Sequence, residues 1–198
     1  MTVSKRVGLL CILLGVLLAA AALVLLQNNR QEDATAGAAA ASVVQQLQTT
    51  APAVTAAPAA QPDDVESSAM PAETVNGYDY IGVLEIPALD LTLPIMADWD
   101  YDRLKIAPCR QFGSVETNDL VIAGHNYKTH FGYLDQLQVG DTVNFTDVNG
   151  NVTTYHVALT SILQPDDVDA VQNSGYPLVL YSCTYSGKTR LTIFCEKA

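Results

Sequence analysis

Residues 142–163 read TVNFTDVNGNVTTYHVALTSIL, which are two runs rich in Val, Thr and aromatic residues on either side of Asn149-Gly150. β-branched and aromatic residues favour strands, and Asn-Gly favours a hairpin because both residues tolerate a positive φ angle. Side chains alternate between the two faces of a strand, so the second run has an apolar and a polar face, formed by Tyr155, Val157 and Leu159 and by Thr154, His156 and Thr160. This stretch predicts an antiparallel β-hairpin.

Similar runs, bounded by Gly, Pro, Asn or Asp, recur along the C-terminal part of the chain. The predicted strands are 80–86, 91–95, 120–123, 142–145, 152–163, 178–182 and 191–195. Helical signals are brief there, and the candidates are 100–105 and 166–172. The predicted fold class is therefore all-β, a barrel or sandwich with one or two short helices.

The N-terminal part begins with a membrane-like segment, the unbroken apolar run VGLLCILLGVLLAAAALVLL at residues 7–26. At 1.5 Å rise per residue such a helix spans about 30 Å, the thickness of the hydrocarbon core of a bilayer. We predict a transmembrane anchor over residues 1–27. The alternative is a cleaved signal peptide, since alanines occupy 19–22, but the run is longer than such peptides usually are.

The charges that flank this run predict its orientation. Lys5 and Arg6 precede it, whereas Arg30 after it is offset by Glu32 and Asp33. The positive-inside rule therefore predicts a single-pass protein of the cell membrane, with a cytoplasmic N-terminus and the rest of the chain outside the cell.

Composition divides the remainder into a linker and a domain. Residues 28–77 are rich in Ala, Thr, Gln and Pro and lack aromatic side chains, which predicts a flexible linker. All nine Tyr, all four Phe and the single Trp follow, so residues 78–198 are the predicted folded domain. The chain has 10 Lys and Arg against 21 Asp and Glu, a balance that argues against a nucleic-acid partner.

The four cysteines lie in different sequence contexts. Cys11 belongs to the apolar run and is interpreted as a small apolar residue. Cys109 and Cys195 are interpreted as core residues, with a disulfide between them as an alternative because the domain is expected outside the cytoplasm. Cys183 ends the strand LVLYS and opens a loop, so its sulfur could stand at the rim of a barrel.

A thiol that performs acyl transfer needs a nearby base or cation, and an acid that protonates the leaving amine. His125 leaves the end of a predicted strand as Cys183 does, while His130 lies in the next loop and His156 in the middle of a strand. Arg190 begins the final strand, so a tight hairpin would return its guanidinium near the sulfur. There a fixed cation could stabilise an oxyanion; the alternative is a surface arginine.

Five segments in a fixed order behind an anchor and a linker resemble the sortase family. They are Tyr80-Ile-Gly-Val-Leu-Glu-Ile-Pro87, Leu91-Thr-Leu-Pro-Ile95, Val121-Ile-Ala-Gly-His-Asn126, Leu180-Tyr-Ser-Cys183 and Arg190-Leu-Thr-Ile193. The resemblance implies an eight-stranded β-barrel and a cysteine transpeptidase of the Gram-positive cell envelope. Such enzymes cleave an LPxTG-like sorting signal between Thr and Gly through a thioester and transfer the acyl group to a cell-wall or pilin amine.

The resemblance also implies roles for individual residues: Cys183 as the nucleophile, His125 as the acid and base, and Arg190 as the oxyanion and substrate clamp. The family's Thr-Leu-x-Thr-Cys reads Val179-Leu-Tyr-Ser-Cys183 here, so Ser182 keeps a hydroxyl that is implied to contact substrate. The subclass stays open. Gly124-His-Asn126 followed by Phe131-Gly-Tyr-Leu134 is similar to class B sortases, whereas the short segment before His125 and the loop 164–172 look more like class A or D.

We expect no cofactor, although some sortases bind Ca²⁺ through acidic loops. Asp166, Asp167 and Asp169 offer oxygen ligands of the kind that Ca²⁺ prefers, but adjacent aspartates after a proline more often form a solvated turn. His125 and His130 do not have the HExxH spacing of a zinc hydrolase. Two alternative functions remain, an envelope peptidase or amidase with water as acceptor and a catalytically silent tethered binding module.

Overall fold

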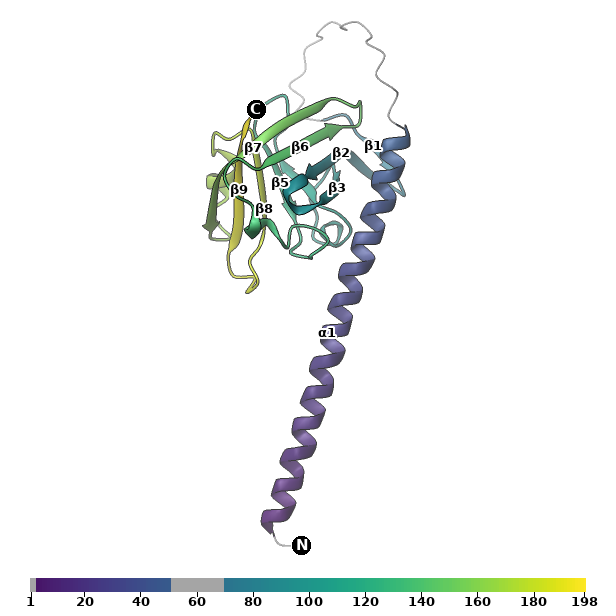
Figure 1. Cartoon of the computed structure of the whole chain (residues 1–198), viewed down its shortest axis with the longest axis vertical. Coiled ribbons are helices and arrows are strands. Elements are labelled where there is room, and N and C mark those ends of the chain that lie inside the picture. Colours follow the sequence, from purple (N-terminus) through teal and green to yellow (C-terminus); the bar gives the residue numbers. More distant parts are fainter. Residues whose placement is uncertain (1–2, 51–69) are drawn as a thin grey trace, which may run out of the picture. The chain divides into compact units, whose positions relative to one another are not determined.

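The computed structural model describes residues 3–50 and 70–198 (Figure 1). The chain divides into two compact units, Met1–Thr35 and Ala36–Ala198. A single helix, α1 (Val3–Thr50), contributes to both units. Within Leu10–Thr49 an 18-residue window has a mean hydropathy of 2.7, so the helix is long and apolar enough to cross a membrane. None of the residues in this window is buried.

Helix α1 corrects the predicted linker. The linker was expected to begin at residue 28, but the helix continues to Thr50. Residues 34–50 are mostly Ala, Gln, Val and Thr without a proline, and Ala and Gln favour helices. Pro52 comes two residues after the helix ends, as expected of a residue that disfavours helix at the position before it. Residues 51–69 of the predicted linker lie outside the described residues.

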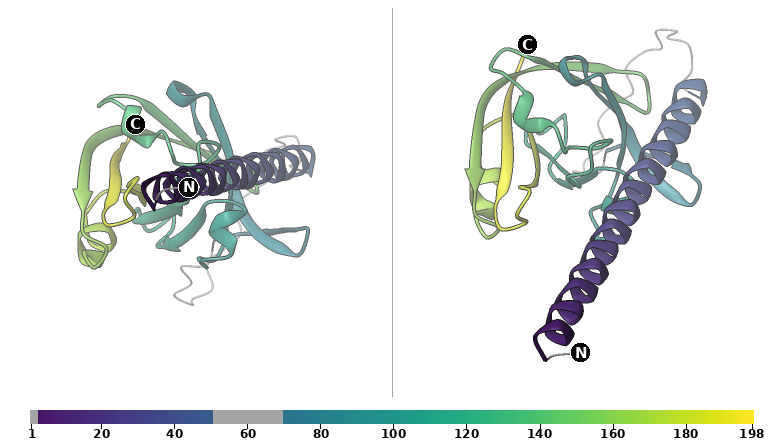
Figure 2. Two further views of the ribbon diagram at one scale, coloured as in Figure 1. Left: turned by 90° about the horizontal axis from the view of Figure 1, so that it is seen from below. Right: turned by 60° about the horizontal axis from the view of Figure 1, so that its bottom comes forward.

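Nine strands form one sheet in the second unit. They are β1 (Glu73–Val75), β2 (Tyr78–Ile86), β3 (Leu91–Met96), β4 (Cys109–Phe112), β5 (Leu120–Gly124), β6 (Thr142–Asp147), β7 (Val152–Leu163), β8 (Leu178–Cys183) and β9 (Arg190–Lys197). The order is β2-β3-β4-β5-β8-β9-β7-β6, and pairing of β6 with β2 closes it into an eight-stranded barrel. Figure 2 shows the strands curving around one interior. The predicted all-β barrel is confirmed.

All seven predicted strands form, while β1 and β4 were not predicted. Strand β1 pairs with β2 across Asn76-Gly77, where both residues have positive φ angles of 53° and 83°. The folded part thus begins before residue 78, and Met70 is already buried in the core. Strand β4 is short and carries half-buried polar residues, so it lacks the apolar pattern that marks a strand.

Short helices cover part of both predicted helical segments. The segment 166–172 contains helix α2 (Val168–Gln172), and the segment 100–105 contains a 3₁₀ turn, Arg103–Lys105. Two further 3₁₀ turns, Pro87–Leu89 and Leu134–Gln136, were not predicted.

The predicted hairpin joins β6 to β7, with two differences. The loop is longer than two residues, and of the Asn149-Gly150 pair only Gly150 takes a positive φ, at 85°. The Asp147 carboxylate accepts hydrogen bonds from the backbone amides of Asn149 and Asn151 and thereby holds this loop. In β7, Tyr155 and Val157 are buried as predicted, but Leu159 is exposed, because a bulge between Val157 and Leu159 shifts the alternation of faces.

The parallel pair β5 and β8 runs through the centre of the barrel wall. Its register extends from Leu120 opposite Leu178 to Gly124 opposite Ser182. Alternate β8 side chains, such as Leu180, belong to the main barrel core, whereas Val179 packs in a smaller outer cluster. The ends of both strands are therefore fixed by buried packing on both faces.

Candidate active site

The parallel register brings the predicted site residues to one edge of the barrel. Gly124 of β5 lies opposite Ser182 of β8, so His125 and Cys183, each the next residue along the chain, leave the sheet at the same edge. Cys183 is in turn paired with Arg190 across the antiparallel strands β8 and β9. The three residues therefore come from three neighbouring strands at one edge.

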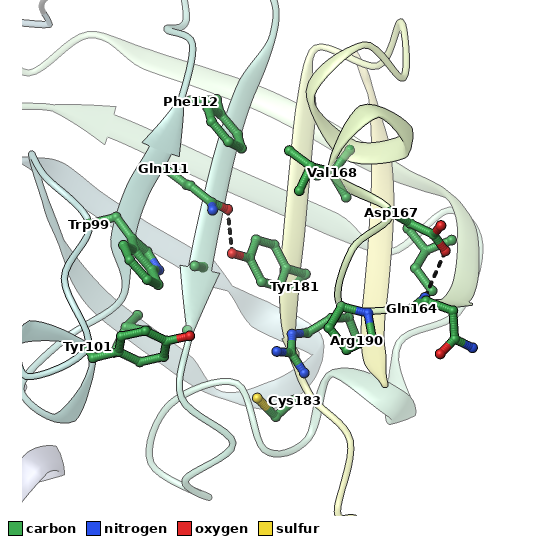
Figure 3. Close-up of a pocket in the computed structure, with 16 residues that line it drawn as sticks. Trp99, Tyr101, Gln111, Phe112, Gln164, Asp167, Val168, Tyr181, Cys183 and Arg190 are labelled. Atoms are coloured by element: carbon green, nitrogen blue, oxygen red, sulfur yellow. Dashed lines mark hydrogen bonds between the residues drawn. The ribbon is translucent and has the colours of Figure 1, made fainter. Parts of the chain in front are cut away.

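A cavity of about 180 Å³ lies beside this edge. Its walls combine aromatic and aliphatic side chains with a few polar groups, and its lining residues are Trp99, Tyr101, Leu104, Gln111, Phe112, Ala123, Gly124, Leu163, Gln164, Pro165, Asp167, Val168, Val171, Tyr181, Cys183 and Arg190. Figure 3 shows the Cys183 sulfur and the Arg190 guanidinium together at one end of the cavity. Trp99 and Tyr101 form one wall in this view, and the segment from Gln164 to Val168 forms the opposite wall.

The predicted return of Arg190 by a tight hairpin is confirmed. Within this hairpin the Thr184 amide donates to the Thr189 carbonyl at 3.0 Å, and the Gly187 amide donates to the Thr184 carbonyl at 2.8 Å. The Arg190 Nη1 donates to the carbonyls of Gly187 and Thr189 at 3.2 and 3.3 Å. These bonds hold the Arg190 guanidinium over the hairpin. The backbone of Arg190 pairs with that of Cys183, so the guanidinium lies next to Cys183.

His125 lies in a compact loop that follows β5. The Phe131 amide donates to the His125 carbonyl at 3.1 Å, and the amides of His130 and Gly132 both donate to the Tyr127 carbonyl. The His125 ring stacks on the Tyr127 ring, with 3.9 Å between ring centroids and an angle of 21°. His125 is half-buried and is not among the residues that line the cavity. Its position is therefore set by the loop.

Gly124 allows this loop to fold back onto the strand end. A Cβ atom at position 124 would lie 2.3 Å from Cδ2 of Phe131, and backbone and ring could not both keep their places. Phe131 is fully buried in the barrel core. Glycine is required here by close approach, since the φ angle of Gly124 is not positive.

Ser182 lies beneath the loop and does not line the cavity. Alternation along β8 points Tyr181 and Cys183 to the cavity side and Ser182 to the opposite side, where its side chain is 2% exposed. Its hydroxyl donates to the Phe131 carbonyl at 3.4 Å. This position favours support of the His125 loop over the predicted contact with substrate.

The remaining histidines lie elsewhere. His130 is 1% exposed, and its ring lies 5.6 Å from that of Tyr127, between ring centroids. His156 is exposed on β7, opposite Thr142 and Glu196 in the neighbouring strands. Among the three histidines, His125 is thus the one placed beside Cys183 by strand register.

All four cysteines are free thiols among the described residues, and their surroundings differ. Cys109 and Cys195 are fully buried in different core clusters, which confirms the core interpretation over a disulfide. Burial raises the pKa of each of these two thiols to about 12. Cys183 is partly exposed at the cavity, and Cys11 is exposed on α1.

The acidic loop of the calcium hypothesis is engaged in local hydrogen bonds. The Asp167 carboxylate accepts from the Gln164 amide at 2.8 Å, and the Asp169 carboxylate accepts from the Asn173 side-chain amide at 2.6 Å. Across residues 3–50 and 70–198, no group of three or more His, Cys, Asp or Glu side chains is placed to hold a metal ion.

Sequence reasoning missed a partly buried polar pair that lines the cavity. The Tyr181 hydroxyl donates to the Gln111 side-chain oxygen (Figure 3). Burial raises the pKa of Tyr181 to about 12, although the nearby Arg190 cation opposes this shift, so the phenol stays neutral and remains a donor. Tyr181 could have been found from its spacing, two residues before Cys183 on the same strand face. Gln111 belongs to β4, which carries no such signal.

The molecule is thus a closed eight-stranded β-barrel with a partly exposed thiol and a guanidinium at one end of a strand-edge cavity. The sequence model of a protein family described as "Sortase domain" matches residues 84–198, which is more than half of the chain. The chain belongs to the sortase family.

Solved structures of sortases share this fold. Sortase C from Clostridium perfringens SM101 is 22% identical, with a TM-score of 0.51 over 61% of this chain and 70% of that chain. Sortase A from Corynebacterium diphtheriae is 23% identical, with a TM-score of 0.54 over 61% of each chain. The Clostridium perfringens sortase D5 transpeptidase is 24% identical, with a TM-score of 0.54 over 64% of this chain and 82% of that chain. No curated protein matches the sequence.

The different burial of the thiols predicts selective alkylation of Cys183. With a pKa of about 12, only about one in 10⁴ of the Cys109 or Cys195 thiols is ionised at pH 8, and both are shielded from reagent. Iodoacetamide at pH 8 should therefore modify Cys183 of the folded Cys11→Ala protein, and the other two only after denaturation. Mass spectrometry of peptides measures this order. Labelling of Cys109 or Cys195 before Cys183 in the folded protein would contradict it.

Proposed function

We propose that this sortase is a membrane-anchored cysteine transpeptidase that acts on LPxTG-like sorting signals. The observation that carries the proposal is the pairing of Cys183 with Arg190 at the end of the cavity, with His125 directly after the end of the adjacent parallel strand β5. A nucleophile, a proton donor and a fixed cation at one edge suit acyl transfer from a peptide bond.

In the first half-reaction the Cys183 thiolate attacks the carbonyl carbon of the Thr–Gly bond, and the carbonyl electron pair moves onto oxygen. Arg190 stabilises the resulting oxyanion, because its guanidinium is held beside Cys183 and keeps its charge throughout the reaction. When the intermediate collapses, the C–N bond breaks and the departing glycine amine takes a proton from the His125 imidazolium. The product is a thioester on Cys183.

In the second half-reaction an acceptor amine attacks the thioester carbon and gives a proton to His125. The C–S bond breaks, an amide forms and the Cys183 thiolate returns. These steps use side-chain protons and one fixed cation, and we propose that no cofactor takes part. The acceptor we propose is an amine of a cell-wall precursor or a pilin lysine, in a Gram-positive envelope.

The cavity supports a peptide substrate with apolar residues. Its lining is mainly apolar and aromatic, while the Gln111–Tyr181 pair and Asp167 add a few fixed polar groups. One solved structure of a Clostridium perfringens sortase C contains the C-terminal cell wall sorting motif. We propose by analogy that the residues before the scissile bond of a sorting signal occupy the cavity of this protein.

Product analysis with an LPxTG-type peptide tests the proposal. With triglycine added as the amine, the wild-type chain should give the ligated peptide, whereas Cys183→Ala should give neither ligation nor an acyl-enzyme, because the nucleophile is absent. Cys109→Ala serves as the matched control and should keep the reaction. Hydrolysis alone, unchanged by triglycine, would instead indicate a peptidase, and absence of both products would indicate a binding module.

The role of Arg190 predicts that its charge alone does not suffice. Arg190→Lys keeps the cation but loses the planar fork, so kcat should fall by about 10² to 10³, the usual cost of losing one oxyanion donor. The measurement is kcat/KM on the same peptide, together with the melting temperature. Near-wild-type turnover by Arg190→Lys would show that the guanidinium is not needed and that Cys183 and His125 act as a dyad.

We also propose that α1 anchors the chain with its N-terminus in the cytoplasm and its barrel outside the cell. The apolar window of the helix and Lys5 and Arg6 before it support this orientation. Protease added to intact cells should then digest residues 70–198. Protection of these residues until the cells are lysed would indicate the opposite orientation, with the barrel in the cytoplasm.

A further inference from the structure

The last part of α1 packs against the barrel as an element of the same compact unit, which begins at Ala36. One face of the helix is buried, at the spacing of an amphipathic helix, and the buried residues are Ala36, Ala40, Val43, Val44 and Leu47. Ala40 joins the main barrel core, while Val43, Val44 and Leu47 belong to the cluster that contains Tyr80 and Met96. Residues 36–47 are therefore part of the barrel domain and not of a linker.

At Gly37 this helix comes close to the loop that carries His125. A Cβ atom at Gly37 would lie 2.7 Å from Cγ2 and 2.9 Å from Cβ of Thr129. Ordinary carbon contacts are about 3.5 to 4.0 Å, so any side chain at position 37 must displace Thr129 or the helix by roughly 0.8 Å. Rotation of the threonine alone does not relieve the contact, because its Cβ is also too close.

Thr129 is linked to His125 by the short turn between them. Tyr127, two residues before Thr129, stacks on the His125 ring and accepts two backbone hydrogen bonds from His130 and Gly132. Below the turn, Phe131 is fixed by Gly124 and by the Ser182 hydroxyl. The turn is thus held from the strand side by Phe131, and Gly37 of the helix contacts it at Thr129.

We propose that Gly37 and Thr129 are positioning residues, through which the helix that continues from the membrane segment sets the placement of His125. This inference rests on the proposed function, in which His125 exchanges protons with the thiol and the amines. Neither residue touches the reacting atoms. A displacement of about 1 Å can lower kcat by as much as 10²-fold, so a small contact at this site has a measurable effect.

The substitution Gly37→Ala in the full-length chain in detergent micelles tests the proposal. Alanine is a better helix former than glycine, so this change strengthens α1 and cannot lower activity by weakening the helix. Gly15→Ala is the matched control, because the same change is made in the same helix with no neighbouring atom within 4 Å. Gly37→Ala with Thr129→Gly removes the threonine side chain and relieves the contact.

The expected result is a kcat for Gly37→Ala that is lower by roughly tenfold or more, with an unchanged KM and an altered pH profile. Gly15→Ala should behave as wild type, and the double variant should lose less kcat than Gly37→Ala, because the displacement is relieved although the Thr129 contact is absent. A wild-type kcat and pH profile in Gly37→Ala would overturn the proposal. So would a loss in the double variant as large as in Gly37→Ala, since the effect would then not pass through Thr129.

A second measurement does not depend on turnover. The Tyr127 ring lies against His125, so the ring current shifts the His125 Hε1 NMR signal strongly, and a small displacement changes that shift. In Gly37→Ala the His125 signal should move while that of the exposed His156 stays in place. If the wild-type chain lacked transpeptidation but this pattern held, the proposed function would fail and the positioning contact would stand. An unmoved His125 signal would overturn the contact itself.

Discussion

The register between β5 and β8 is the constraint on which the site depends. These two parallel strands are covered on both faces, and their pairing places Gly124 opposite Ser182. A shift of one residue in β8 would exchange its faces, turning Ser182 toward the cavity and Cys183 into the interior beneath the loop. The packing of Leu178, Val179 and Leu180 opposes such a shift, because each side chain fills a place in a core cluster. The hydrophobic core therefore specifies which side chain is the exposed thiol.

Burial also separates the thiols by chemistry. Cys109 and Cys195 are surrounded by apolar groups that disfavour the thiolate, and their raised pKa makes them poor nucleophiles at neutral pH. Cys183 stands at the end of its strand, next to the cation of Arg190. Strand ends are the positions where a rigid sheet delivers a side chain to solvent without a flexible loop between. The same sheet can thus hold inert and accessible cysteines only a few residues apart in register.

Much of the fold and of the site follows from the sequence, and the failures have physical causes. The seven apolar runs, the two strand ends at His125 and Cys183 and the return of Arg190 were predictable from composition and spacing. The hairpin predicted at Asn149-Gly150 forms, but with a longer loop, whereas the two-residue loop in which both residues take positive φ angles is Asn76-Gly77. The Asn-Gly pair alone does not distinguish the two loops, and the hydrogen bonds of Asp147 stabilise the longer loop at Asn149-Gly150. The outward position of Leu159 depends on a bulge, and Gln111 depends on a tertiary partner, Tyr181.

The end of α1 shows how tertiary contacts decide what composition leaves open. An Ala-rich segment without aromatic residues resembles a linker when it is considered alone, since isolated helices of this length are marginal in water. Its small side chains have a different consequence once a partner surface is present, because Gly37 and Ala40 allow the helix backbone to approach the barrel closely. The apolar residues Val43, Val44 and Leu47 then bury one face against strands that lie far along the chain. The segment is helical because it is packed, and its packing brings it to the loop of His125.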